Sequence, residues 1–285
     1  MAALLRFLFV GDVMGQPGVS MFQKWVPVFK KQYAIDAVVV NGENSAKNGL
    51  GITPKHIQFF RDAGASVVTT GNHVWEHKDV YNALNERDDV TRPANYAPGC
   101  PGKGFAFINL GNVTAAVVNL HGRVFIRDLL DCPFRCMDSL LTYLSTKTNI
   151  IFVDFHAEAT SEKRAMGIYL DGRVSGVVGT HTHVQTADER VLPKGTAYIT
   201  DLGCVGALNS VIGAQSDIII QRFLTYPRAG KFTVDAVPPF VFNGAIITVD
   251  SQTGRAVSIE RISHIDEVLQ PAPLVDEPDK GLRRQ

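Results

Sequence analysis

Short apolar runs alternate with longer stretches of mixed polarity along the first third of this chain. The apolar runs cover residues 4–10, 35–40 and 66–70. Their lengths are typical of strands that are buried on both faces. Between the first two runs, residues 21–33 are amphipathic, and Thr53-Pro54 predicts the start of a helix that ends near Ala63. Strands that alternate with helices at this spacing predict a parallel sheet.

The rest of the chain adds two predicted hairpins to this pattern. Residues 105–110 pair with 113–120, and residues 240–249 pair with 256–262. Further elements are predicted as helices at 134–144 and 158–170 and as strands at 150–155 and 176–178. We interpret residues 1–285 as a single domain, built either on one mixed sheet or on two packed sheets with helices outside. The polar, proline-containing segment 263–285 is predicted to be a surface tail.

Composition and charge narrow the class of protein. Hydrophobic residues make up 45% of the chain and charged residues 20%, which is the composition of a folded globular protein. The 28 basic and 28 acidic residues give a formal net charge of zero. Extended nucleic acid and anionic membranes are bound mainly through clustered Lys and Arg, so neither partner is expected.

The amino-terminal segment and the cysteines bear on the cellular compartment. The apolar run at 4–10 contains Arg6 and is followed at once by Gly11-Asp12, so we interpret it as a buried strand rather than a signal peptide. No apolar stretch reaches the roughly 18 residues that a membrane-spanning helix needs. The four cysteines show no CxxC pair and do not form a disulfide framework. A cytoplasmic location is therefore expected.

Residues that can bind metals follow five of the predicted strands. They are Asp12, then Glu43 and Asn44, then Asn72 and His73, then His156, and finally His181 and His183. In α/β sheets, ligands bind beyond the carboxyl ends of the strands, so these side chains are expected to meet at one edge of the sheet. If residues 181–183 are extended, both imidazoles point to the same side.

The residue types point to a particular class of metal. Imidazole and carboxylate suit Fe, Mn and Zn, and the cluster contains no Cys. Two cations about 3.5–4 Å apart repel each other, and a bridging carboxylate offsets part of that charge. Each motif alone is weak, because a single Asn-His pair occurs at many surface turns. The five motifs in this order make chance assembly a poor explanation.

The ordered motifs resemble those of the calcineurin-like metallophosphoesterase superfamily. The longer segments Gly42–Ser45, Thr70–Trp75, His156–Lys163 and Gly179–Asp188 are similar to the YmdB-like branch of bacterial phosphodiesterases. The resemblance extends from Phe9 to about Ile262. It implies an α/β fold in which mixed sheets form an α/β/β/α sandwich flanked by helices. It also implies a metal-dependent phosphodiesterase that acts on small nucleotides, with 2′,3′-cyclic nucleotides as the expected substrates.

The resemblance also implies roles for the individual residues. Asp12, Glu43, Asn44 and His183 would hold one metal ion, and Glu43, Asn72, His156 and His181 would hold the other, with Glu43 as the bridge. The two ions, divalent or trivalent, would be iron, with manganese or zinc as alternatives, and would activate water for attack on phosphorus. His73 would act as the acid for the leaving group. The alternative for His73 is a supporting residue that only orients Asn72 or water.

The sequence departs from the superfamily pattern at three places. Met14 stands where the first motif commonly has His, and Glu43 stands where the bridge is commonly Asp. Both departures resemble the YmdB-like branch. The segment 204–210 carries Ala207 and Asn209, where the family is expected to have a Gly-Pro pair and an acidic residue. This third departure bears on substrate recognition and leaves the metal ligands intact.

One further loop offers candidate substrate contacts. Arg92 could pair with phosphate and Tyr96 could stack on a base, but a rigid proline turn explains this segment equally well. The other histidines are given structural or surface roles, except that lining the cleft is an equal alternative for His77. Of these, His56 is assigned to a surface helix, and His264 is assigned to the start of the tail.

Three functional hypotheses follow from the sequence. The first is a phosphodiesterase for small nucleotides, and the second is a phosphomonoesterase or nuclease on the same metal ligands. The third is a regulator that acts through a protein partner, such as an RNA-processing enzyme. His73 favours catalysis, because binding alone does not need an acid for a leaving group. The sequence does not determine whether the chain forms a homo-oligomer.

Overall fold

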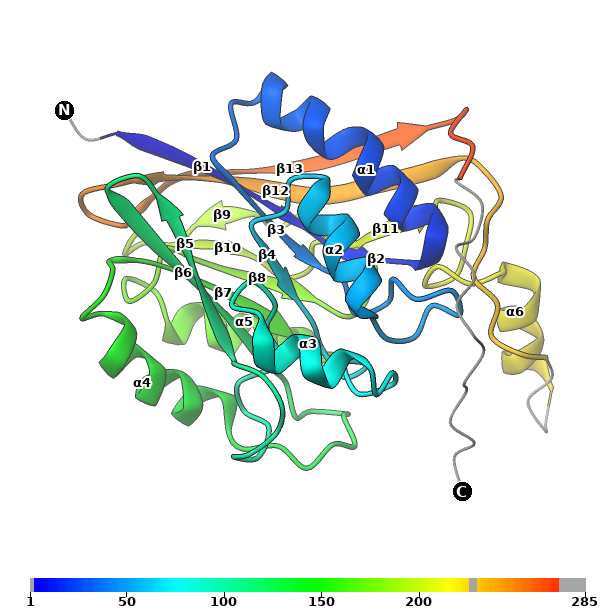
Figure 1. The fold of residues 1–285 in the computed structure, drawn as a ribbon, viewed down its shortest axis with the longest axis horizontal. Helices are drawn as coiled ribbons and strands as arrows, with labels where there is room; N and C mark the ends of the chain where they lie inside the picture. Colours follow the sequence, from blue (N-terminus) through cyan, green and yellow to red (C-terminus); the bar gives the residue numbers. More distant parts are fainter. Residues whose placement is uncertain (1–2, 226–229, 272–285) are drawn as a thin grey trace.

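The computed structural model, which describes residues 3–225 and 230–271, has two β-sheets packed face to face between layers of helices (Figure 1). In spatial order, the first sheet contains β2 (Asp12–Val13), β11 (Cys204–Ala207), β12 (Phe240–Asp250), β1 (Leu4–Val10), β3 (Ala37–Asn41) and β4 (Val67–Thr69), and β13 (Ala256–Asp266) pairs with β12. Strands β1, β3 and β4 are parallel, and β12 is antiparallel to β1. The first sheet is therefore mixed.

The second sheet is also mixed. In spatial order it contains β5 (Phe105–Leu110), β6 (Val113–His121), β7 (Ile150–His156), β8 (Gly176–Thr180), β10 (Ala197–Ile199) and β9 (Arg190–Val191). Its four central strands, β6, β7, β8 and β10, are parallel, whereas β5 and β9 run antiparallel at the two edges. The carboxyl ends of the parallel strands in both sheets lie on the same side of the sandwich (Figure 1).

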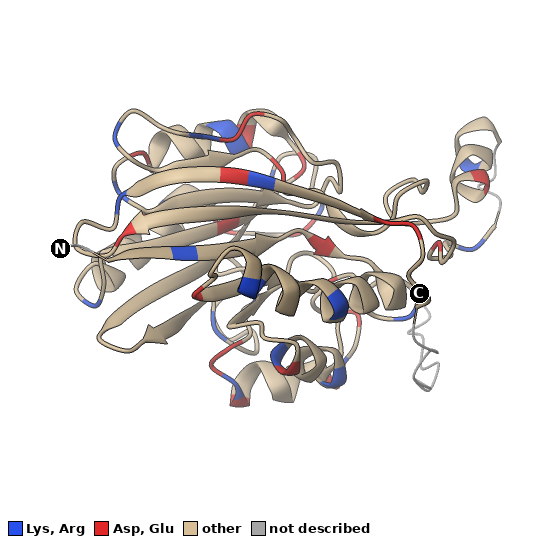
Figure 2. Cartoon of the chain, turned by 90° about the horizontal axis from the view of Figure 1, so that it is seen from above, with Lys and Arg blue, Asp and Glu red and all other residues tan. Residues whose placement is uncertain are grey.

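Helices cover the two outer faces. They are α1 (Gly15–Gln32), α2 (Pro54–Asp62), α3 (Val80–Glu86), α4 (Pro133–Leu144), α5 (Thr160–Tyr169) and α6 (Ser216–Leu224). Buried residues of α1 and α2 pack on the first sheet, and those of α4 and α5 pack on the second. Helix α6 projects from one end of the molecule (Figures 1 and 2). Within the described residues, no helix combines the length and apolarity that crossing a bilayer would require.

The apolar strands of the sequence are explained by burial on both faces. In β1, Phe7 and Phe9 point between the sheets, while Leu8 and Val10 point toward the helices of the first layer. The Phe152 ring of the opposite sheet lies 4.6 Å from the Phe7 ring and 4.9 Å from the Phe9 ring, centroid to centroid. Because neither face meets water, the strand shows no alternation of polar and apolar residues.

The structure confirms the predicted α/β/β/α sandwich and both hairpins. Helix α1 begins at Gly15, whereas the sequence predicted an amphipathic segment from residue 21. The prediction missed the first turn because that turn contains two glycines and has no amphipathic pattern. Short elements were also missed: β2, β9, β10, β11, α3 and α6. Strand β13 continues to Asp266, so the first residues of the predicted tail at 263–285 belong to the sheet. The part of this tail after residue 271 lies outside the described residues.

Two histidine assignments were wrong. His56 lies on α2 but is only 5% exposed, and its Nδ1 lies 2.9 Å from Thr53 Oγ1. Thr53 occupies the cap position ahead of Pro54, as predicted, but its hydroxyl contacts this imidazole and not a backbone N–H. His264 lies within β13 and not in a tail, and its ring centroid is 3.8 Å from that of Trp25. His264 thus packs between β13 and α1, whereas the His56 ring is buried against residues at the start of α2 and within it.

Candidate metal centre and active site

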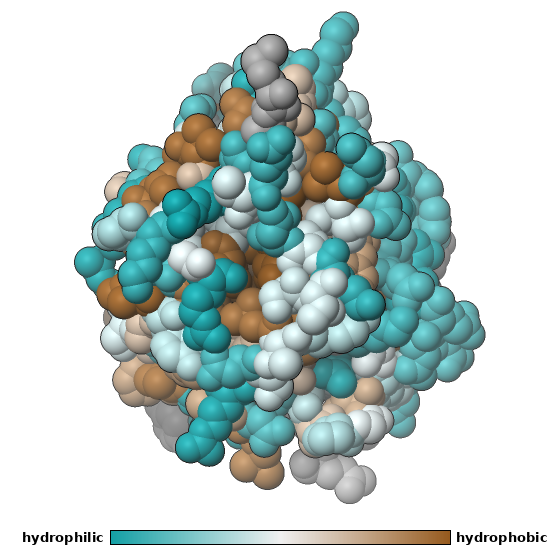
Figure 3. All heavy atoms as spheres, turned by 90° about the vertical axis from the view of Figure 1, so that its left-hand side faces the viewer, coloured by the Kyte–Doolittle hydropathy of each residue, from teal (hydrophilic) through white to brown (hydrophobic). Residues whose placement is uncertain are grey.

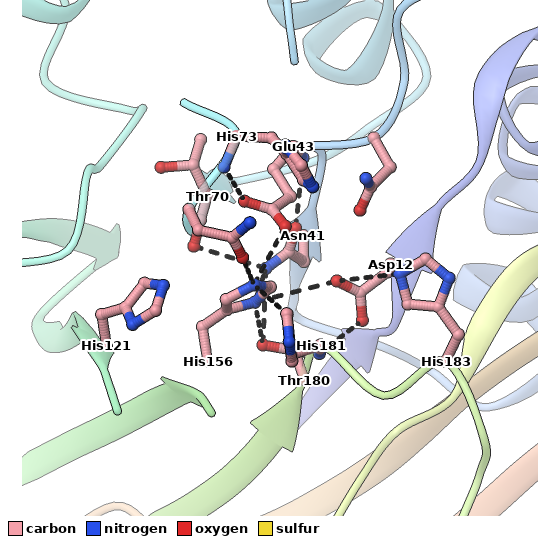
Figure 4. Close-up of polar contacts among 12 residues, drawn as sticks. Asp12, Asn41, Glu43, Thr70, His73, His121, His156, Thr180, His181 and His183 are labelled. Carbon is pink, nitrogen blue, oxygen red and sulfur yellow. Dashed lines mark hydrogen bonds and ion pairs between the residues drawn. The ribbon is translucent and has the colours of Figure 1, made fainter. Parts of the chain in front are cut away.

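The predicted ligands meet at the carboxyl ends of strands from both sheets (Figure 4). In the first sheet, Asp12 begins β2, Glu43 follows β3 and Asn72 follows β4. In the second sheet, His156 ends β7 and His181 follows β8. The site therefore lies between two sheet edges, and the expectation of a single edge was wrong. Because the ligand residues come from both sheets, their side chains can surround an ion from two directions.

His156 is the centre of one group of ligand atoms. Its ring is fully buried, and its Nε2 lies 2.9 Å from Glu43 Oε1 and 2.9 Å from Asn72 Oδ1. His181 Nδ1 lies 3.0 Å from the same nitrogen. Glu43, His156 and His181 thus offer ligand atoms that are mutually close enough to hold a metal ion.

The hydrogen bonds of His156 determine which ring nitrogen carries the proton when the ring is neutral. Thr180 Oγ1 donates its only proton to Asp154 Oδ1 at 2.7 Å, so it accepts a hydrogen bond from His156 Nδ1 at 3.0 Å. The proton of a neutral His156 is then on Nδ1, and Nε2 presents a lone pair to two oxygens and another nitrogen. A proton on Nε2 could satisfy one of these three atoms, whereas a metal ion satisfies all of them.

A second group of ligand atoms lies beside the first. Asp12 is fully buried; its Oδ2 accepts a hydrogen bond from the His181 backbone at 3.1 Å, but its Oδ1 has no hydrogen-bond partner. Asn44 is also buried, and its amide nitrogen donates to the Gly49 carbonyl at 2.9 Å while its Oδ1 has no partner. His183 Nε2 lies 3.9 Å from Asp12 Oδ1. Buried oxygens without donors are costly, and a cation would compensate them.

The electrostatics of both groups fit the same interpretation. Burial raises the pKa of Asp12 to about 8, since nothing nearby offsets the cost of its charge fully. Burial would also raise the pKa of Glu43, but the adjacent His156 holds it below its ordinary value. Burial and then the charge of His156 lower the pKa of His181 to about 2, so this imidazole is neutral and can bind a metal. Buried carboxylates and a neutral imidazole are donors that fit a bound cation.

The loop that carries His181 and His183 is not extended. Strand β8 ends at Thr180, and the φ angles of the two histidines are +100° and +65°. Non-glycine residues rarely adopt this left-handed conformation, so the expected side-by-side arrangement on a strand was wrong. The loop instead folds so that His181 faces His156 while His183 Nδ1 lies 3.0 Å from the Ile212 carbonyl.

A cavity of about 390 Å³ opens over the ligands. Its lining consists of Met14, Glu43, Asn44, Gly49, Leu50, His73, Glu158, His181, Thr182, His183, Ile212 and Phe232. His73 lies in this wall, where its Nδ1 is 3.5 Å from Glu76 Oε1 and its backbone N–H donates to Glu43 Oε2 at 3.0 Å. The described residues that line the cavity include no Lys or Arg.

Arg92 and Tyr96, the candidate substrate residues, lie outside this lining. Arg92 is buried, and its Nη1 donates to the carbonyls of Pro93 and Ala94. Tyr96 donates its hydroxyl to Asp128 at 3.1 Å and packs edge-on against Trp75. The geometry of both favours the rigid proline turn. In the segment 204–210, Ala207 is buried in β11 and does not reach the cavity.

Several supporting residues were not predicted. Glu158 Oε2 lies 3.1 Å from His181 Nε2, and Thr180 connects His156 to the buried Asp154. Asn41 Oδ1 accepts from the Glu43 backbone at 3.1 Å. These residues all lie within or beside the recognised motifs, but their polar side chains gave no signal of their own, because strand ends are commonly polar.

A larger hollow, of about 590 Å³, lies at the amino ends of β3 and β4, opposite the candidate site. Figure 3 views the molecule from this end and shows polar residues around a hollow with apolar residues at its base. Three of its charged side chains bind one another: Asp89 lies 2.8 Å from both Arg61 Nε and Arg87 Nε. Paired charges of this kind are typical of a solvated surface.

Comparison with known proteins gives consistent results along almost the whole chain. The sequence profile of the YmdB-like protein family matches residues 8–262. The 2′,3′-cyclic-nucleotide 2′-phosphodiesterase of Bacillus subtilis (strain 168) is 46% identical over 258 residues, which cover 90% of this chain and 96% of that protein. These matches bear out the resemblance that the motifs indicated.

Two solved structures share the fold. A hypothetical protein from Thermus thermophilus is 42% identical, with a TM-score of 0.85, and the match covers 92% of this chain and 100% of that one. A novel phosphatase from Mycoplasma pneumoniae is 34% identical, with a TM-score of 0.86, and the match covers 94% and 95%. Both matches cover more than nine-tenths of this chain.

Proposed function

Because this chain belongs to the YmdB-like protein family, we propose that it hydrolyses 2′,3′-cyclic nucleotides with the help of two bound metal ions. The protein is a phosphodiesterase of the metallophosphoesterase type. The observation that carries the proposal is the convergence on His156 Nε2 of three ligand atoms that no proton can satisfy together.

We assign the ligands as the family resemblance implies, and the two groups of buried ligand atoms support this assignment. The first ion would be held by Asp12, Glu43, Asn44 and His183, and the second by Glu43, Asn72, His156 and His181. When bound, such a pair of ions acidifies water and offsets charge on the phosphoryl oxygens. The protein contributes a buried, preorganised set of ligands whose own hydrogen bonds fix their orientation.

The expected metals follow from the donor atoms. Imidazole nitrogens with carboxylate and amide oxygens suit iron, and they also suit manganese or zinc. Cys204 is paired in register with Asp12, but burial raises the pKa of its thiol to about 12. Among the described residues, the group that could hold a metal ion consists of Glu43, His156 and His181 and does not include Cys204.

His73 is assigned to the leaving group. Its Nδ1 faces Glu76, which orients the ring, and the ring lies in the wall of the cavity. The backbone of the same residue donates to Glu43, so its position is tied to the proposed bridging ligand. A histidine held in this way can donate a proton to the departing oxygen.

The shape and charge of the cavity support a nucleotide diester as substrate. Met14, Leu50, Ile212 and Phe232 form an apolar part of the lining next to the ligands. Such a wall suits a nucleobase or the carbon face of a ribose. The neutral overall charge and the interspersed basic and acidic residues in Figure 2 do not favour an extended nucleic acid. A short nucleotide with one negative charge fits these features best.

The proposal is tested by measuring bound metal and hydrolysis on the same preparation. Protein purified without chelator should contain more than one equivalent of metal and should open 2′,3′-cyclic nucleotides. Saturation at one equivalent would reject the dinuclear site. A metal-loaded protein that opens none of the four 2′,3′-cyclic nucleotides would reject the substrate assignment.

A further inference from the structure

A buried ion pair lies directly behind the loop that carries His181 and His183. Lys163 on α5 places its Nζ 2.5 Å from Asp201 Oδ2, and both side chains are only 1% exposed. Burying a lysine and a carboxylate costs free energy that a surface pair avoids. Because such a pair adds little stability, its location next to the candidate site indicates a role in positioning neighbouring residues.

Asp201 binds the residue between the two histidines. Its Oδ2 accepts hydrogen bonds from the backbone of Thr182 at 3.2 Å and from the Thr182 hydroxyl at 2.8 Å. Its Oδ1 accepts from the Gly203 backbone at 2.8 Å. Thus one carboxylate holds the loop, while Lys163 holds that carboxylate in place from the helix.

The loop needs such support, because its backbone is strained on both sides of Thr182. His181 and His183 both have positive φ angles, which residues with a Cβ rarely adopt unless the surroundings impose them. The His181 backbone also donates to Asp12, but the two contacts of Thr182 with Asp201 hold the segment at the residue between the strained histidines. Relaxation of either histidine would turn its imidazole away from its ligand group.

The packing of Lys163 also excludes the simpler role of a phosphate-binding cation. The lysine is not part of the cavity lining. Its stem lies against Gly179, where an added Cβ would come within 3.1 Å of Lys163 Cδ and would overlap the Thr200 carbonyl. The absence of a side chain at Gly179 lets the lysine approach Asp201 behind the loop.

We propose that Lys163 and Asp201 are positioning residues that hold Thr182 and thereby set His181 and His183 in the geometry required of metal ligands. This inference rests on the proposed function of the site. It assigns to Lys163 a role through the metal ligands and not through the substrate.

The test compares the affinity for Mn²⁺ of three metal-free proteins by isothermal titration calorimetry. Lys163→Met removes the charge that holds Asp201. Lys24→Met is the matched control, because Lys24 also lies 2.5 Å from a carboxylate, that of Asp266, on the far side of the first sheet. Removal of a residue that orients metal ligands costs about 10–100-fold in metal affinity. We expect this loss for Lys163→Met, with Lys24→Met unchanged.

A readout beyond affinity separates positioning from stability. The hydrolysis rate of Lys163→Met should recover toward the wild-type kcat when Mn²⁺ is raised above its weakened Kd, because the ligands themselves are intact. A Lys163→Met protein that folds and binds Mn²⁺ as tightly as wild type would overturn the proposal. So would a folded Lys163→Met protein that loses affinity no more than Lys24→Met does.

Thr182→Val provides the decisive variant if Lys163→Met does not fold. It removes only the hydroxyl that donates to Asp201, and we expect it to weaken Mn²⁺ binding about tenfold, as for loss of a hydrogen bond to a charged group. Unchanged affinity in Thr182→Val would then reject the inference. These outcomes are independent of substrate: wild-type protein that binds two Mn²⁺ ions but hydrolyses no diester would reject the proposed function alone.

Discussion

At the scale of single residues, Glu43 and His73 are adjacent in space but have separable roles. Glu43 contributes a carboxylate oxygen to the ligand group, while His73 contributes its ring to the cavity wall and only its backbone N–H to Glu43. Replacement of each side chain by Ala therefore disturbs different things. The backbone hydrogen bond survives in His73→Ala, but the carboxylate proposed as the bridging ligand is lost in Glu43→Ala.

We predict that His73→Ala keeps its bound metal and loses turnover, whereas Glu43→Ala loses metal and activity together. General acid catalysis contributes about 10²–10⁴-fold to rates, so kcat of His73→Ala should fall within that range. Elemental analysis and kcat, measured on the same samples, check both statements. If His73→Ala also loses metal, His73 is a ligand and its assignment as the acid is incorrect.

Gly71 lies against two of the proposed metal ligands, His156 and Glu43, and leaves no room for a larger residue. A Cβ added here would lie 2.3 Å from Cδ2 and Nε2 of His156 and 2.5 Å from Glu43 Oε2, which is too close for either contact. Neither neighbour can move away, because His156 is fully buried and Glu43 is 1% exposed.

We predict that Gly71→Ala lowers metal affinity about 10–100-fold, since it displaces two ligands at once. Gly111→Ala is the control, because its added Cβ meets nothing within 4 Å, although its φ of +67° is unfavourable for Ala. The control should lose some stability, seen as a lower Tm, and keep its metal. Equal metal affinities in the two variants would show that the close contact at Gly71 is tolerated.

At the scale of elements, the sequence predicted the buried strands and amphipathic helices well. Strand β1 and both hairpins were evident, because continuous apolar runs and Gly-containing turns have direct physical meanings. The first turn of α1 was not evident, because its glycines pack closely: a Cβ on Gly18 would overlap the Val205 carbonyl. Tertiary contact, not local propensity, determines such segments.

For the site, too, the sequence predicted what depends on local pattern and missed what depends on tertiary contacts. Metal-binding residue types at strand ends were visible in the sequence, and their convergence followed from the parallel strands. The conformation of residues 181–183 was not visible, because it depends on Asp201 from a distant part of the chain. Burial of Arg92 was missed for a different reason: its partners are carbonyls of its own loop, and backbone carbonyls give no signal in a sequence.

Helix α2 offers a prediction about pH. Burial, followed by the charges of His77 and Lys55, lowers the pKa of His56 from 6.5 to about 4. Between these two values the unfolded chain binds more protons than the folded one, so stability rises with pH across this window. As pH falls from 6.5 to 4, the protein should lose up to about 3 kcal/mol of unfolding free energy through this group.

His56→Gln should flatten this dependence, because Gln can still contact Thr53 but does not titrate. Urea unfolding of both proteins at pH 7 and pH 5 provides the measurement, and the difference between wild type and variant isolates the contribution of His56. Parallel stability curves for the two proteins over this range would show that His56 is protonated without cost.

At the scale of the whole molecule, the two facing sheets determine both the ligands and the charge of the cavity. Ligands arrive from strand ends on both sides, and the described lining of the cavity contains Glu43 and Glu158 but no Lys or Arg. The nearby cations are committed elsewhere: Lys163 binds Asp201, and Arg92 binds the carbonyls of its own loop. Only the bound metal ions would then offset the charge of a substrate.

This distribution of charge predicts that diesters are preferred over monoesters. A terminal phosphate carries close to two negative charges and is usually bound by Arg pairs or additional cations, which the described lining lacks. A 2′,3′-cyclic phosphate carries one charge, and its leaving oxygen remains tethered to the ribose, so a single attack by water opens the ring. We therefore expect kcat/KM to be higher for a 2′,3′-cyclic nucleotide than for the matching 3′-monophosphate at one metal and one pH. A generic aryl diester separates preference for the diester from recognition of the nucleoside, and should also exceed the monoester. Faster turnover of the monoester than of both diesters would instead identify the protein as a phosphomonoesterase on the same metal centre.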